Sequence, residues 1–254
     1  MTTDTTVAVT PREPELPGQI VVAIGGSAGI GLETARRARA EGAEVILTGR
    51  NPERLERAAA EVGARGTAAF DATDPAALDR FFDGLPAQID HVMVTGPGPH
   101  YALLAELDHD QAHQDFDGHQ WLAVAVAQHA VGRVRPGGTL VFMGGTGGRS
   151  RGPGLSLIAA ATAAMPALIA NLAVEVAPIR VNLIAAGFVD TPLSATLLGD
   201  DLDARRDQLR ATLPIGRVVG PDDVAKLAVH LMTNTALTGA TYDIDGGQQL
   251  VAKG

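Results

Sequence analysis

The run Gln19-Ile-Val-Val-Ala-Ile24, followed directly by Gly25-Gly-Ser-Ala-Gly-Ile-Gly31, decides the fold of this chain. The first part is a short continuous apolar run, which is typical of a strand buried on both faces. The glycines allow a tight turn, and a helical pattern follows over residues 32–41. The N-terminus of such a helix binds a pyrophosphate, because its free N–H groups and its dipole favour an anion. An ordinary strand-to-helix turn is the alternative, so the placement of the glycines carries the argument.

Strand-like and helical segments alternate along the rest of the chain. The predicted strands are residues 45–48, 67–70, 91–95, 139–143, 180–184 and 241–244, and the predicted helices are residues 51–62, 75–82, 121–131, 157–176 and 221–232. This alternation predicts an α/β fold, a single parallel sheet with helices on both faces. We expect one domain at residues 18–254, after a flexible N-terminal tail at residues 1–17 that has no long apolar run.

The composition limits the function classes. The chain has 254 residues, no cysteine, and 29 acidic against 20 basic residues, for a net charge of −9. The absence of cysteine excludes disulfides and cysteine catalysis, and it suits the cytoplasmic location that we expect. There is no basic stripe to follow phosphates, so no nucleic-acid partner is expected.

Residues 155–177 are nearly all apolar and long enough to suggest a membrane span. The segment is rich in alanine and contains Pro166. These features favour a buried helix that packs on the sheet and on another subunit. We therefore expect no association with a membrane.

The residues that follow the second and third predicted strands bear on the choice of cofactor. A carboxylate after the second strand would bind a ribose 2′-hydroxyl, but this chain has Arg50 and Asn51 there. A guanidinium binds a 2′-phosphate, so the sequence favours NADP (as NADPH) over NAD, unless Arg50 is only a solvated residue at a helix start. Asp71, next to Ala72, could accept from the adenine amino group, or could be a loop residue before a helix that Asp74 caps.

The sequence resembles the short-chain dehydrogenase/reductase family over about residues 19–251. The matching motifs, in the family's order, are residues 25–31 (GGSAGIG), 179–182 (IRVN), 187–192 (GFVDTP), 216–221 (GRVVGP) and 243–247 (DIDGG). The resemblance implies that the sheet is doubly wound, of Rossmann type. It also implies a nicotinamide cofactor over the carboxyl ends of the strands, a small-molecule substrate, and a homodimer or homotetramer. It assigns the remaining cofactor contacts to Gly25, Ser27, Ala28, Gly29, Ile30, Gly31, Thr95, Gly96, Val189 and Thr191.

The positions that carry catalysis in the family are changed in this chain. By the resemblance, the catalytic Ser falls on Gly145, the Tyr on Ile158 and the Lys on Thr162, and the Asn of the fourth helix falls within residues 118–120. In the family the Tyr gives or takes a proton while a hydride moves between cofactor and carbonyl carbon, and the Lys lowers the pKa of that Tyr. Isoleucine cannot replace the Tyr, and such a positioned group contributes ~10²–10⁴-fold.

A replacement for the missing acid has to come from another part of the chain. Tyr101 and His100 follow the fourth predicted strand, where the switch-point rule places ligands, so they are the catalytic candidates. The alternative is that both are surface residues of that loop. Histidines and aspartates recur at residues 108–119, but their spacing matches no firm metal template, and no metal site is predicted.

Two functions remain open from the sequence. The first is an NADP(H)-dependent oxidoreductase with a non-standard active site, acting on an unknown carbonyl or alcohol. The second is an NADP-binding pseudoenzyme that serves as a sensor or a noncatalytic subunit. The retained cofactor motifs favour the first.

Overall fold

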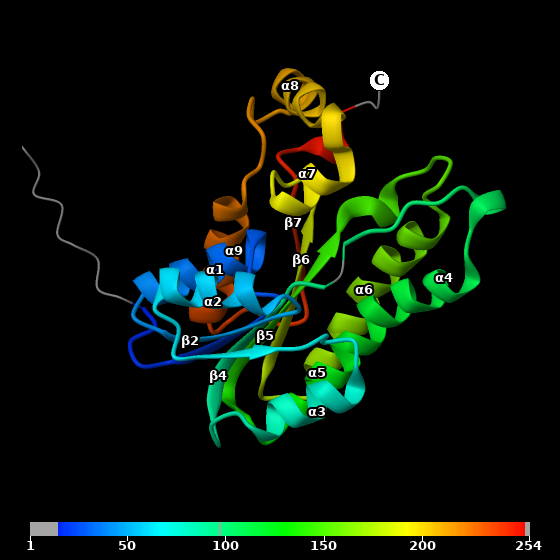
Figure 1. Cartoon of the computed structure of the whole chain (residues 1–254). Helices are drawn as coiled ribbons and strands as arrows, with labels where there is room; N and C mark the ends of the chain where they lie inside the picture. The colour runs from blue at the N-terminus through cyan, green and yellow to red at the C-terminus, as the bar shows by residue number, and fades with distance from the viewer. Residues whose placement is uncertain (1–14, 97, 252–254) are drawn as a thin grey trace, which may run out of the picture.

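The computed structural model describes residues 15–96 and 98–251. Its centre is a sheet of seven parallel strands in the order β3-β2-β1-β4-β5-β6-β7 (Figure 1). The strands are β1 (Ile20–Ile24), β2 (Glu44–Gly49), β3 (Gly66–Ala69), β4 (Ile89–Val94), β5 (Val134–Gly145), β6 (Arg180–Ala186) and β7 (Thr241–Ile244). The predicted doubly wound parallel sheet is confirmed.

Nine α-helices lie within the described residues. They are α1 (Gly29–Ala40), α2 (Pro52–Val62), α3 (Pro75–Asp83), α4 (His109–Phe116), α5 (Leu122–Ala130), α6 (Ser156–Glu175), α7 (Pro192–Leu198), α8 (Leu202–Thr212) and α9 (Pro221–Thr233). The sequence pattern had not predicted α4, α7 and α8.

Two apolar clusters, one on each face of the sheet, form the core. Buried residues of α1, α2 and α9 pack on one face, and those of α3, α5 and α6 pack on the other (Figure 1). Strands whose two faces are both covered read as continuous apolar runs, which is the pattern seen in β1.

Side-chain caps explain where two of the predicted helices begin. The Asn51 side chain accepts a hydrogen bond from the N–H of Arg54 at the start of α2. Asp74 accepts from Ala76 and Ala77 at the start of α3, as predicted. Each helix then has proline in its first turn, where no hydrogen-bonding N–H is needed.

The start of the domain differs from the predicted boundary. Residues 1–14 of the expected tail lie outside the described residues. Leu16 is buried in the core, and its N–H donates to the carbonyl oxygen of Glu41. The packed domain therefore begins at or before Leu16, and not at residue 18.

Helix α6 is, within the described residues, the one helix long and apolar enough to cross a membrane. Its inner face carries Met165, Ile169 and Leu172, which belong to the core, so it covers the sheet as the sequence predicted. Its outer face is exposed and carries alanines and Val174.

Candidate active site

The glycine-rich loop after β1 forms a tight cradle with the end of β4. Gly25 has a φ of +83°, and a Cβ atom there would lie 2.1 Å from Oγ1 of Thr95. A Cβ atom on Gly31 would lie 2.3 Å from the carbonyl oxygen of Gly25. Both positions therefore require glycine. The structure brings these residues together as the sequence predicted.

The first turn of α1 faces this cradle without a side-chain cap. Ala28 is the N-cap residue, and no side chain caps the helix, whose first turn also carries no acidic residue. The N–H groups of a helix start and its dipole suit a phosphate. The cradle that a Cβ atom would fill and the uncapped turn both fit a dinucleotide pyrophosphate, held by residues 25–31.

The loop after β6 approaches the glycine-rich loop. A Cβ atom on Gly29 would lie 3.5 Å from Cβ of Thr191. The hydroxyl of Thr191 accepts from the N–H of Ser194 at 3.3 Å and so caps α7. Val189 is buried and pairs with Val219. The predicted contacts from residues 189 and 191 thus lie beside the cradle.

The residues at the predicted adenosine end already have partners within the protein. The Asn51 side chain caps α2. Asp71 accepts from the N–H of Thr73 at 3.0 Å and from its hydroxyl at 2.8 Å. The N–H bond from Thr73 is the main cause that lowers the pKa of Asp71, and the charge of Arg50 also lowers it. Arg50 is exposed. Its charge is felt at Asp71, so both residues lie at the same end of the site.

Gly145 and Thr162 face each other between the end of β5 and helix α6. A Cβ atom on Gly145 would lie 3.5 Å from Cγ2 of Thr162. The hydroxyl of Thr162, which is buried, donates to the carbonyl oxygen of Ile158 at 2.7 Å. The Thr162 hydroxyl, which lies near the end of β5, therefore donates its hydrogen bond within its own helix, α6.

A π-helical turn at Asp117–Trp121 joins α4 to α5 and contributes Gln120 to this region. Nε2 of Gln120 donates to the carbonyl oxygen of Ala161 at 2.8 Å. Its Oε1 atom is buried and accepts from no described protein group. The same turn approaches the end of β4, where a Cβ atom on Gly96 would lie 3.8 Å from the carbonyl oxygen of Gly118. A glycine inside an otherwise helical stretch was the sequence signal for this turn.

His100 and Tyr101 line a depression of about 490 Å³ together with α4 and the chain before it. Nδ1 of His100 lies 3.2 Å from Oδ2 of Asp115, and Oδ1 of Asp115 accepts from Gln111 at 2.9 Å. The Tyr101 side chain is 55% exposed, and its partial burial raises the pKa of its phenol. None of the residues predicted to bind the cofactor lines this depression.

The loop that carries His100 and Tyr101 touches both α7 and the chain before α6. A Cβ atom on Gly98 would lie 2.9 Å from Cδ1 of Leu193, at the start of α7. A Cβ atom on Gly154 would lie 3.7 Å from the backbone of Ala102. The loop therefore passes over the carboxyl ends of the strands, while its two candidate side chains line the depression beside α4.

A family model described as enoyl-(acyl carrier protein) reductase matches residues 25–249. The chain belongs to the short-chain dehydrogenase/reductase family. It is an oxidoreductase of this type, and the parallel sheet described above is the fold of the family.

Curated members of the short-chain dehydrogenase/reductase family match nearly the whole chain. It is 26% identical to malC of Malbranchea aurantiaca, with 92% of this chain and 96% of that protein covered. It is 30% identical to the 4-formylbenzenesulfonate dehydrogenase of Comamonas testosteroni, covering 91% and 98%. It is 27% identical to the NADP-dependent (R)-specific alcohol dehydrogenase of Lentilactobacillus kefiri, covering 91% and 97%.

The solved structure of the MalC reductase/Diels-Alderase from Malbranchea aurantiaca superposes with a TM-score of 0.84. It is 26% identical, and the match covers 94% of this chain and 99% of that one.

Proposed function

We propose that this protein is an NADP(H)-dependent oxidoreductase with a non-standard active site, acting on a carbonyl or alcohol. The observation that carries the proposal is the glycine-rich loop after β1: Gly25 and Gly31 have no room for a side chain there, and the loop leads into the uncapped first turn of α1. Two of the relatives are named as dehydrogenases, and one of these as NADP-dependent. When bound, NADPH supplies the hydride.

The phosphate that distinguishes NADP from NAD would lie at Arg50. The Arg50 guanidinium is exposed after β2. Residues 48–51 include no carboxylate that would repel the phosphate. An arginine binds a phosphate through two parallel hydrogen bonds. Ser27 lies close to the same strand end, since a Cβ atom on Gly49 would lie 2.7 Å from its hydroxyl oxygen.

The proton in this proposal comes from the loop after β4. Asp115 faces Nδ1 of His100, so the imidazolium form of the ring would donate from Nδ1 to Asp115 and give its Nε2 proton to the substrate oxygen. The phenol of Tyr101 is the neighbouring donor. This role requires the loop to turn its side chains toward Ile158. The contact of Gly154 with the backbone of Ala102 supports it, because it holds the loop against the chain just before α6.

Titration calorimetry with NADPH and NADH, followed by turnover of NADPH with a panel of small aldehydes and ketones, tests the proposal. We expect binding of NADPH in preference to NADH, and oxidation of NADPH with at least one carbonyl compound. Tight NADPH binding without any turnover would instead indicate the pseudoenzyme. Failure to bind either dinucleotide would contradict both functions.

For the assembly, we propose a cytoplasmic homodimer or homotetramer that associates through α6. The outer face of α6 is exposed and is built from small apolar side chains such as Ala163, Ala167 and Ala170. Small residues let two helices approach closely. Light scattering should give a dimer or larger for the wild type and a smaller species for Ala167→Arg.

A further inference from the structure

Asp190 and Arg206 form a two-point ion pair between the loop after β6 and helix α8. Nε of Arg206 lies 2.9 Å from Oδ2 of Asp190, and Nη2 lies 2.7 Å from Oδ1. Both side chains are 30% exposed. A guanidinium that makes two parallel bonds to one carboxylate is fixed in direction as well as distance. The pair therefore sets the orientation of α8 relative to the loop.

The loop that carries Asp190 is bonded to two other segments of the chain. The N–H of Asp190 donates to the carbonyl oxygen of Val219 at 2.9 Å, and Val189 pairs with Val219. The N–H of Phe188 donates to the Gln248 side chain at 2.9 Å. The chain before α9 and the C-terminal segment thus both bond to this loop, and these bonds favour the backbone arrangement in which Asp190 meets Arg206.

A second arginine of α8 reaches the same loop. The guanidinium carbon of Arg205 lies 5.9 Å from the centre of the Phe188 ring, a distance at which a cation is attracted to an aromatic face. Arg205 and Arg206 therefore both bind residues within 188–190. Asp190 itself lies between Val189 and Thr191, the two residues of this loop assigned to the cofactor.

Helix α8 has few other attachments. Within α8, which the structure describes in full, Leu209 is the buried residue. Gly199, with φ of +52°, precedes the helix, and Gly216, with φ of +67°, follows it. A Cβ atom at either glycine would meet open space. In Figure 1, α7 and α8 stand at one end of the sheet, apart from the helices that cover its faces. The segment that contains α8 is thus joined to the domain by two turns, at Gly199 and Gly216, that have open space around them, and by a few specific contacts.

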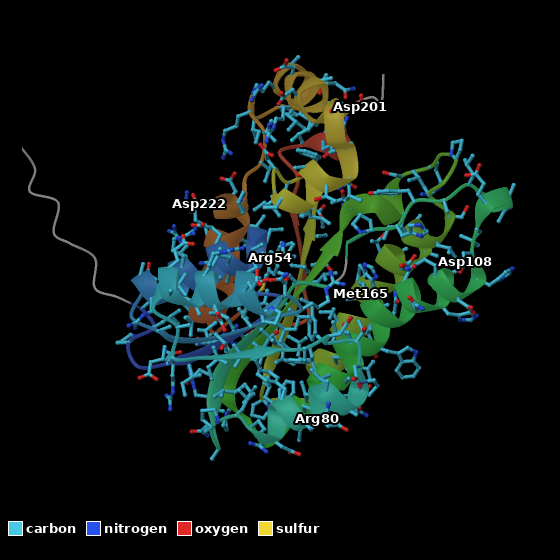
Figure 2. The ribbon with its side chains drawn as sticks, in the orientation of Figure 1. Arg54, Arg80, Asp108, Met165, Asp201 and Asp222 are labelled. Carbon is cyan, nitrogen blue, oxygen red and sulfur yellow. The ribbon has the colours of Figure 1, made fainter. Side chains whose placement is uncertain are left out.

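The position of this segment matters for the site because α7 begins at Thr191. The hydroxyl of Thr191 caps α7, and the first turn of α7 brings Leu193 against Gly98 of the loop after β4. Figure 2 labels Asp201, just before α8, on the same raised segment. A shift of α8 would therefore reach α7 and the contact between Leu193 and Gly98.

We propose that Asp190 is a positioning residue: through Arg206 it couples the placement of α7 and α8 to the occupation of residues 189–191 by the cofactor. This inference rests on the proposed function. Cofactor binding and closure of residues 192–212 then stabilise each other, because both need the loop in one arrangement. An ion pair that merely stabilises the fold would not link the two.

Hydrogen exchange and NADPH titration on four variants test the coupling. Arg206→Gln and Asp190→Asn remove one partner each, and Arg206→Lys keeps the charge but loses the two-point geometry. Arg210→Gln is the matched control, because Arg210 pairs with Asp207 on the same helix and does not reach the loop. Thermal unfolding confirms that each variant is folded.

In the wild type we expect NADPH to slow amide exchange over residues 192–212. Arg206→Gln and Asp190→Asn should lose this protection and bind NADPH about fivefold more weakly, at the lower end of couplings between sites. Arg206→Lys should fall between them and the wild type, and Arg210→Gln should match the wild type.

Three outcomes would overturn the inference, and they are distinguishable. If the wild type binds NADPH but Arg206→Gln and Asp190→Asn keep both affinity and protection, the coupling is wrong and the proposed function stands. If the wild type binds no NADPH, the proposed function fails and the coupling fails with it. A loss of affinity equal in Arg210→Gln and Arg206→Gln would show a general effect of charge, which also contradicts the coupling.

Discussion

The hydroxyl of Thr162 donates to the carbonyl oxygen of Ile158, one turn earlier in the same helix, at 2.7 Å. These are the two positions at which the family resemblance puts the catalytic Lys and Tyr. A threonine that bonds back to the preceding turn has satisfied its donor locally. The Thr162 hydroxyl is therefore used within α6, and our proposal takes the proton from the loop after β4.

Thr162→Val should leave NADPH affinity and turnover within about twofold of the wild type. The reason is that the hydroxyl donates to Ile158 and, at 3.3 Å, faces Ala159, so it has no donor left for a ligand. Calorimetry and steady-state kinetics check this. A tenfold loss of turnover in a folded Thr162→Val protein would show that this hydroxyl acts on the substrate or cofactor.

Gly31→Ala should abolish measurable NADPH binding and lower the free energy of unfolding by about 1–3 kcal/mol. The added Cβ atom would lie 2.3 Å from the carbonyl oxygen of Gly25, and no side-chain rotation relieves a contact with backbone. Gly66→Ala is the control, because a Cβ atom there meets nothing within 4 Å. Urea unfolding and calorimetry measure both effects. Normal affinity in Gly31→Ala would contradict the cradle as the pyrophosphate site.

Arg50→Glu should weaken NADPH binding by about tenfold or more, since a hydrogen bond to a charged group contributes about 1.5–3 kcal/mol. Affinity for NADH should be kept or should rise, because NADH lacks the 2′-phosphate and the new carboxylate can accept from its ribose 2′-hydroxyl. Arg57→Glu makes the same charge change on the exposed surface of α2. Equal losses in the two variants would mean that only the net charge matters.

His100→Gln should lower turnover by about 10²-fold if Nε2 of His100 supplies the proton. Asp115→Asn should lower it less and change its pH profile, because Asp115 orients the ring from 3.2 Å. Tyr101→Phe tests the neighbouring phenol, and His113→Gln, on the exposed side of α4, is the control. Full activity of both His100→Gln and Tyr101→Phe would remove this loop from the mechanism.

Stability should fall with decreasing pH because of His91. Burial lowers its pKa from 6.5 to about 3, and its ring bonds to Oε1 of Gln19 at 2.7 Å. Below pH 6.5 the His91 ring is protonated in the unfolded chain but stays neutral in the folded protein. The free energy of unfolding therefore falls as the pH decreases from 6.5 toward 3.

The pH range below 6.5 allows a quantitative comparison of the wild type with His91→Gln. One proton accounts for about 1.4 kcal/mol per pH unit. Urea unfolding between pH 7 and pH 4.5 should therefore show a steeper loss in the wild type than in His91→Gln, by about that slope. Parallel slopes for the two proteins would show that His91 is not the group responsible.

Much of the fold was accessible from local sequence patterns. The continuous apolar run of β1 and the proline-led starts of α2 and α3 are local signals, and the structure confirms each of them. Helix α8 escaped prediction because it buries one residue and so shows no apolar stripe. The start of α7 was visible in principle, since Thr191 followed by proline is a helix-start signal.

What the sequence by itself determined is the parallel sheet and the glycine cradle, because strand, turn and helix starts depend on residues adjacent in the chain. The tertiary structure alone decided which distant side chains meet: Thr191 at Gly29, Asp115 at His100 and Arg206 at Asp190. The first contact joins the loops after β6 and β1, and the other two join a loop to a later helix of the same connection; the geometry of all three is set by how the helices pack. No local pattern records that packing, so the chemistry of this site depends on the folded chain.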